Sequence, residues 1–135
     1  MLRRLAYHSI ATGTVGYQDA VEIASEARRN NALNAICGLL IFRDGRFFQV
    51  VEGHADAIGE LYEKLRADPR HRDLELLCDE PIAAPAFHGF AMPLFGEQDG
   101  ARLLHRLGEE AVPPEIIALI GQYATGETGW EDGGG

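Results

Sequence analysis

Long apolar runs are absent from this sequence of 135 residues. No stretch approaches the ~20 consecutive apolar residues that cross a bilayer, and no basic segment followed by an apolar one opens the chain. We therefore expect a soluble, cytoplasmic protein without a membrane partner. Cysteine is scarce as well, because only Cys37 and Cys78 occur, both in apolar, strand-like runs and outside any C-x-x-C motif. In a reducing compartment this pattern predicts two buried free thiols.

Basic residues are also few. Lys and Arg number 12 against 21 Asp and Glu, so the net charge is −9. Nucleic-acid binding depends on clustered Lys and Arg, and the basic pair Arg28 and Arg29 is too small to provide such a surface. We therefore expect no direct contact with nucleic acid.

The apolar content of 46% is enough for the core of one domain, and its periodicity predicts the elements. Strands are expected at 2–12, 36–42, 46–52, 74–78 and 87–95, and helices at 17–30 and around 58–65. Asp44-Gly45 is a strong hairpin signal, and Asp68-Pro69 ends the second helix. The order β-α-β-β-α-β-β predicts an α+β, ferredoxin-like sheet with both helices on one face.

The last third of the chain is expected to cover the other face of this sheet. In the strand at 46–52, Phe47 and Gln49 face one way while Phe48 and Val50 face the other, so both faces need a cover. We predict a core domain at 1–95, a helical appendage at 96–127 and a disordered tail at 128–135. Either the appendage or a partner subunit would cover the second face.

Gln49 is the most unusual residue, since it places an amide inside an apolar strand. Leaving such a group unpaired when buried costs about 1–3 kcal/mol. Taken alone, it could hydrogen-bond a backbone group or a buried water. Tyr7 could likewise pack in a strand with its hydroxyl at an edge, and Asn31 could be a helix cap.

Taken together, these residues are more informative. The sequence resembles the BLUF family of flavin-binding blue-light sensors over roughly residues 2 to 95. The matching pieces are Tyr7, Asn30-Asn31, Gly38-Leu39-Leu40, Asp44-Gly45-x-Phe47-x-Gln49-x-x-Glu52-Gly53, Asp68-x-Arg70-His71 and Phe87-x-x-Phe90-x-Met92. Six pieces in register make the resemblance specific.

The resemblance implies a blue-light receptor that holds FAD, or FMN or riboflavin in its place, between its two helices. Tyr7, Gln49 and Met92 would be the photochemical residues, with Gln49 bridging Tyr7 and the flavin edge. The residues expected to hold the flavin are Asn30, Asn31, Ile23, Asp68, Arg70 and His71. His71 could equally be solvated.

The resemblance also implies a mechanism without a consumed substrate. Tyr7 would give an electron and, through Gln49, a proton, and the amide would be left rotated or as its imidic tautomer. Phe90 stands where the family often has tryptophan, so side-path electron transfer there should be weaker, and Met92 could serve only as core filling. Phe90 and Met92 are expected to relay the signal to a downstream protein that the sequence does not identify. A homodimer or larger homo-oligomer is expected.

Rival interpretations are weaker. A small hydrolase or metal site is not indicated, because the five histidines lack ligand spacing. A flavin reductase would need a nicotinamide-binding glycine motif, which we do not find. We therefore expect no enzyme and no metal. The remaining alternative is a degenerate interaction module that has lost its flavin.

Overall fold

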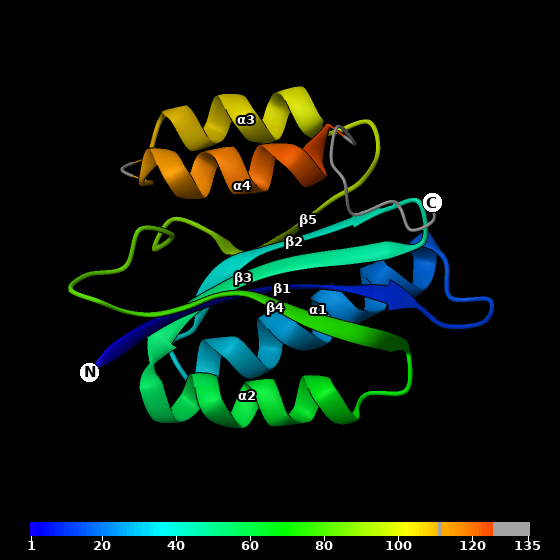
Figure 1. Ribbon diagram of the computed structural model, residues 1–135, viewed down its shortest axis with the longest axis horizontal. Coiled ribbons are helices and arrows are strands. Elements are labelled where there is room, and N and C mark those ends of the chain that lie inside the picture. Colours follow the sequence, from blue (N-terminus) through cyan, green and yellow to red (C-terminus); the bar gives the residue numbers. More distant parts are fainter. Residues whose placement is uncertain (111, 126–135) are drawn as a thin grey trace.

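A five-stranded mixed sheet with helices on both faces organises the chain (Figure 1). The computed structural model describes residues 1–110 and 112–125, and the side chains of residues 31–33 lie outside that description. The elements are β1 (Leu2–Ala11), α1 (Tyr17–Leu33), β2 (Cys37–Arg43), β3 (Arg46–His54), α2 (Ala55–Ala67), β4 (His71–Ile82), β5 (Ala91–Phe95), α3 (Gly100–Gly108) and α4 (Pro114–Ala124). The strand order is β4-β1-β3-β2-β5, with β5 parallel to β2 and the other neighbours antiparallel. The predicted ferredoxin-like α+β fold is confirmed.

The two faces of the sheet have separate covers, as the alternation in β3 predicts. Helices α1 and α2 lie on one face, and α3 and α4 lie on the other (Figure 1). Phe48 and Val50 belong to the core cluster that includes the buried side chains of α3 and α4. Phe47 and Val51 belong to the clusters on the α1 and α2 side. The chain's own C-terminal helices, rather than a partner subunit, therefore cover the second face.

Two boundaries differ from the sequence prediction. Strand β4 is longer than expected, because antiparallel pairing with β1 continues along its length to Ile82. Strand β5 is shorter and begins at Ala91, because Phe87 and Phe90 lie in a turn closed by the Phe90 amide bonding the Phe87 carbonyl at 2.8 Å. Helix α2 ends at Ala67, just before Asp68-Pro69, as predicted. The expected tail at 128–135 lies outside the described residues.

Two backbone conformations shape the centre of the sheet. Asp44 and Gly45 have φ of 53° and 72°, the left-handed pair of a tight hairpin turn between β2 and β3. Gly38 has φ of 149° in β2, and a β-carbon there would lie 1.9 Å from the Val50 carbonyl oxygen. Only glycine permits this close approach of β2 and β3. In the described part of the chain, no helix is both long and apolar enough to span a membrane.

Candidate functional site

The site begins with a hydrogen bond between two neighbouring strands. Tyr7 of β1 stands directly opposite Gln49 of β3 in the antiparallel register, so their side chains share a face. The Tyr7 hydroxyl donates to Gln49 Oε1 at 2.7 Å. The two residues are only 3% and 4% exposed. The strand pairing thus positions a phenol and an amide together inside the protein.

The other end of the Gln49 amide meets Met92. Gln49 Nε2 donates to the Met92 sulfur at 3.3 Å, and a thioether is a weak acceptor. Met92 is fully buried and has φ of 59°, beside a register irregularity between β2 and β5. This left-handed conformation is uncommon for a residue with a side chain. Gln49 is therefore held firmly at its oxygen and weakly at its nitrogen.

A small pocket opens next to Tyr7 on the helix-covered face. Its volume is about 20 Å³. Five of the residues predicted from the sequence line it together, namely Tyr7, Ile23, Asp68, Arg70 and His71, along with Leu40, Phe47 and Leu65. These residues come from α1, the sheet, the end of α2 and the segment that enters β4. The fold thus brings together residues that lie as far apart as 7 and 71.

Charged groups stand at this pocket. Arg70 donates to Asp68 at 2.7 Å and to Glu26 of α1 at 3.1 Å. Hydrogen bonds from Arg70 lower the pKa of the Asp68 carboxyl, and the same carboxyl raises the pKa of Arg70. Arg70 is 37% exposed at its side chain, so its guanidinium reaches solvent.

His71 is ordered rather than simply solvated. Its Nε2 donates to the Leu65 carbonyl at 2.5 Å, because a carbonyl can only accept, and its Nδ1 shares a hydrogen bond with the Ser9 hydroxyl at 2.6 Å. Its ring meets the Tyr7 ring edge-on, with centroids 6.0 Å apart. His71 thus forms part of the wall behind Tyr7.

Asn30, one of the two predicted asparagines, is not among the residues that line the Tyr7 pocket. Asn30 is exposed and lines a second small pocket of about 40 Å³ with Ile36, Ala57 and Leu61, between α1 and the first half of α2. Its side chain is therefore not brought beside Tyr7. The side chain of Asn31 lies outside the described residues.

Burial has a direct effect on the Tyr7 phenol. It raises the pKa of Tyr7 above its usual value, and the Asp68 carboxylate adds to the rise. The folded state therefore favours the neutral phenol. Below the unfolded pKa of about 10, the ionisation of Tyr7 should cause no pH dependence in the free energy of unfolding. Above that pH, the free energy of unfolding should fall as pH rises.

We expect Tyr7→Phe to make that alkaline loss of stability shallower, as measured by urea unfolding at pH values on both sides of about 10. Equal slopes for Tyr7→Phe and wild type would contradict this assignment.

Phe90 lies on the opposite face from the Tyr7 pocket. It is fully buried in the cluster shared with α3 and α4. The guanidinium of Arg106, on α3, lies 4.1 Å from the centre of its ring and donates to the Gly89 carbonyl at 2.7 Å. Phe90 and Met92 therefore touch different layers of the protein although they are two positions apart.

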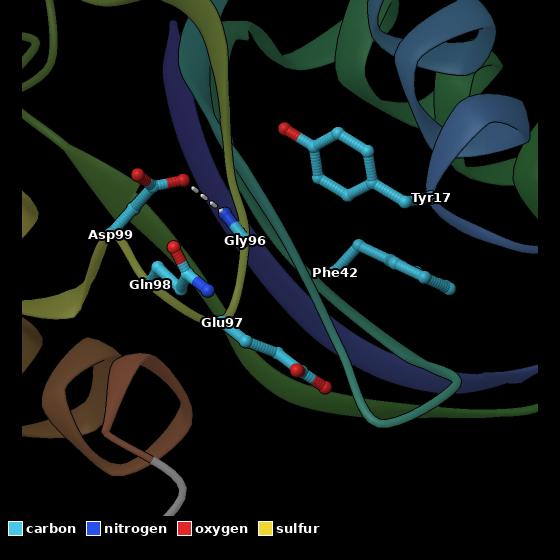
Figure 2. A pocket seen from close by; sticks show the side chains of 6 residues that line it. All are labelled: Tyr17, Phe42, Gly96, Glu97, Gln98 and Asp99. Atoms are coloured by element: carbon cyan, nitrogen blue, oxygen red, sulfur yellow. Dashed lines mark hydrogen bonds between the residues drawn. The ribbon is translucent and has the colours of Figure 1, made fainter.

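A larger pocket, of about 490 Å³, lies between the start of α1, the end of β2 and the segment after β5. Figure 2 shows Tyr17, Phe42 and Gly96 to Asp99 around it, with the Gly96 amide donating to Asp99 at 2.7 Å. Among the predicted site residues whose side chains the structure describes, none lines this pocket. Its size alone therefore does not make it the functional site.

Sequence reasoning missed the burial of Glu52. Its side chain has no exposed area, and it pairs with Arg4, whose side chain is 6% exposed. The signal was present, because Glu52 follows Phe48 and Val50 on an apolar face just as Gln49 follows Phe47 on the other. The cysteines are free, as predicted, but only half-buried. Burial raises the pKa of Cys37 to about 12 and of Cys78 to about 11.

The comparisons with known proteins agree with this geometry. Residues 2–93 match the family described as sensors of blue-light using FAD, BLUF. The chain belongs to the BLUF family. This BLUF domain is thus a blue-light sensor domain, and BLUF domains bind flavin.

Among proteins of known sequence, the chain is 40% identical over 86 residues to photoactivated adenylate cyclase subunit beta of Euglena longa, covering 64% of this chain and 10% of that protein. It is 35% identical over 80 residues to the blue light- and temperature-regulated antirepressor BluF of Escherichia coli (strain K12), covering 58% of this chain and 20% of that one. The chain therefore spans a fifth or less of the length of these relatives.

Solved structures resemble nearly the whole chain. The structure of Klebsiella pneumoniae BlrP1 with FMN and cyclic diGMP has a TM-score of 0.80 and 30% identity, over 99% of this chain and 36% of that one. The ground state of BlsA has a TM-score of 0.72 and 27% identity, over 92% of this chain and 88% of that one. The similarity to BlsA therefore includes most of both chains.

Proposed function

We propose that this chain is a blue-light receptor that binds FAD beside Tyr7 and Gln49, between α1 and α2, and signals by contact with another protein. The observation that carries the proposal is the buried Tyr7–Gln49–Met92 chain of hydrogen bonds, 2.7 Å and 3.3 Å long. An amide held so weakly at its nitrogen can change partners at low cost.

The residues around the pocket suit a flavin. Ile23, Leu40, Phe47 and Leu65 offer apolar surface for a ring system, and the Arg70 guanidinium suits a phosphate. Ligand sites usually measure roughly 300–1,000 Å³, so side chains of α1 and α2 must move apart for the ring to enter. The Arg70–Glu26 pair, which links the segment before β4 to α1, would open in that movement. We propose that Asp68, His71, Asn30 and Asn31 complete the site.

When bound, the flavin supplies the light-excited oxidant. Tyr7 is placed to give up an electron, and its phenolic proton already points at Gln49 Oε1. Once Tyr7 has regained an electron and a proton, the Gln49 amide can be left rotated, with its carbonyl and amino ends exchanged. It can also be left in the imidic form, in which Oε1 keeps the proton from Tyr7 and one Nε2 proton has restored the Tyr7 hydroxyl. Either change alters what Gln49 presents to Met92 and to the pocket. FMN and riboflavin carry the same ring and are possible substitutes.

The output would pass through Met92 and Phe90. Met92 contacts Gln49, and Phe90 lies under Arg106 of α3. We propose residues 1–95 as the flavin-binding unit and residues 96–127 as the element that passes the signal on. A homodimer or larger homo-oligomer is part of this proposal, and size-exclusion chromatography in darkness and light tests it.

The decisive experiment is the absorption spectrum of the purified protein. We expect a yellow protein whose flavin bands shift slightly and reversibly to the red under blue light. A colourless protein that takes up no added flavin would instead support the alternative, a BLUF-like interaction module without flavin.

Arg70 should matter for phosphate-bearing flavins. We expect Arg70→Ala to weaken FAD binding roughly tenfold, the loss of a charge-assisted hydrogen bond. Binding of riboflavin, which has no phosphate, should change much less. Fluorescence titration of both flavins measures this, with Arg66→Ala on α2 as the control, because Arg66 pairs only locally with Glu63. Equal losses for both flavins would refute a phosphate contact.

A further inference from the structure

A row of charged side chains crosses the sheet on the face covered by α3 and α4. Arg4 of β1 stands opposite Glu52 of β3 on one side and opposite Glu80 of β4 on the other. It bonds Glu52 at 2.9 Å and Glu80 at 2.8 Å. Glu52 is the buried member, whereas 45% of the Glu80 side chain is exposed. A buried carboxylate of this kind needs several partners to be tolerated.

Glu52 finds its other partners in the backbone before β5. Its Oε1 accepts the amide protons of Ala86 at 2.8 Å and Phe87 at 2.9 Å, and the Cys37 thiol lies 3.7 Å away. Hydrogen bonds to a charged acceptor are about twice as strong as neutral ones. Glu52 therefore pins the segment between β4 and β5 to the centre of the sheet.

The same segment is held again a few residues later. The Phe90 carbonyl accepts from the Gly38 amide at 3.0 Å, and Met92 accepts from Gln49 on the opposite face. Gln49 and Glu52 lie three positions apart on β3, with side chains on opposite faces. Strand β3 thus holds both ends of residues 86–92, through Glu52 at one end and Gln49 at the other. Met92, at the second end, has the left-handed backbone conformation.

We infer that Glu52 is a positioning residue for Met92: by anchoring the Ala86 and Phe87 amides, it sets where Met92 lies against Gln49. This inference rests on the proposed function where it concerns the photocycle. The Arg28 guanidinium also donates to the Met92 carbonyl at 3.1 Å, so loss of the Glu52 anchor loosens the position of Met92 against the Gln49 amide without releasing it. The light-induced arrangement of Gln49 and Met92 is then less stable.

Glu52→Gln tests this, with Glu80→Gln as the matched control. Both substitutions remove a carboxylate from Arg4, but only Glu52 bonds the backbone of residues 86 and 87. We expect Glu52→Gln to retain the red shift and to speed dark recovery roughly threefold to tenfold, because the neutral glutamine oxygen accepts the Ala86 and Phe87 amide protons more weakly than the carboxylate does and the barrier to recovery falls. Glu80→Gln should recover as the wild type does. Unchanged or slower recovery in Glu52→Gln, or the same acceleration in both variants, would overturn the inference.

A second measurement needs no flavin. The chain has two methionines, Met1 and Met92, so methyl NMR of the full chain gives one signal for the buried position. We expect the Met92 methyl signal to move and the Ala86 and Phe87 amides to exchange faster in Glu52→Gln, with neither change in Glu80→Gln. Wild-type signals in Glu52→Gln would refute the anchor, whereas a wild type that fails to bind flavin would refute only the proposed function.

If Glu52→Gln does not fold, Arg4→Leu with Glu52→Leu provides a second variant that adds no methionine signal. Replacing a buried ion pair by apolar residues of similar volume is often neutral for stability. This double variant should show the same Met92 methyl shift and amide exchange. A folded double variant with the wild-type Met92 signal would overturn the inference.

Discussion

Gln49→Leu is expected to abolish the reversible red shift under blue light. Leucine has a similar size but offers neither the acceptor that Tyr7 uses nor the donor that Met92 receives. Tyr7 would keep its burial but lose its hydrogen-bond acceptor, at a cost of about 1–3 kcal/mol in the free energy of unfolding. The protein should therefore still fold and bind flavin. Difference absorption spectra before and after illumination provide the measurement.

Gln98→Leu is the matched control for this substitution. Gln98 is exposed and lies beside the larger pocket, among Gly96, Glu97 and Asp99 (Figure 2). The red shift should keep its full amplitude there. A full shift in Gln49→Leu would refute the proposed mechanism, because no other amide bonds Tyr7 among the described residues.

Gly38→Ala should cause the largest loss of stability. The added methyl group would lie 1.9 Å from the Val50 carbonyl oxygen and 2.9 Å from its carbon, both backbone atoms of the neighbouring central strand. Alanine also disfavours φ of 149°. We expect the free energy of unfolding to fall by about 3–5 kcal/mol, since the backbone cannot yield as a side chain can. Urea unfolding monitored by circular dichroism measures the change.

Gly59→Ala is the control, and it should raise the free energy of unfolding, whereas Gly38→Ala should lower it. Gly59 lies inside α2, where the nearest atom to an added β-carbon is the end of the Arg3 side chain, 3.5 Å away. Alanine should stabilise the helix by about 0.5–1 kcal/mol. A similar loss of stability in both variants would show that the strand contact at Gly38 is not the cause.

The order of elements could be predicted because local patterns carry it. The alternation through Phe47 to Val50, the Asp44-Gly45 turn and the break at Asp68-Pro69 each depend on residues close in sequence. The β5 boundary could not, since the apolar residues Phe87 and Phe90 read equally well as strand or as buried turn. Only the backbone hydrogen bond from the Phe90 amide to the Phe87 carbonyl distinguishes the two.

The residues of the candidate site likewise fall into those that the sequence identified and those that it did not. Gln49 could be identified because an amide in an apolar strand is costly without a partner. Asn30 was grouped with Tyr7 by resemblance alone, and its side chain lines a separate pocket. Glu52, like Gln49, is a polar side chain that is costly to bury without a partner. Its partners, Arg4 and the amides of residues 86 and 87, are far away in sequence.

By itself, the sequence determined the fold class, the membership of a light-sensing family and the two apolar faces of β3. The tertiary structure alone decided which polar atoms meet: Tyr7 with Gln49, Gln49 with Met92, and Glu52 with Arg4 and the segment before β5. The physical reason is the distance along the sequence over which each interaction acts. Periodicity and turn chemistry act over a few residues, whereas hydrogen bonds across a sheet depend on strand register, which forms only when distant segments pair.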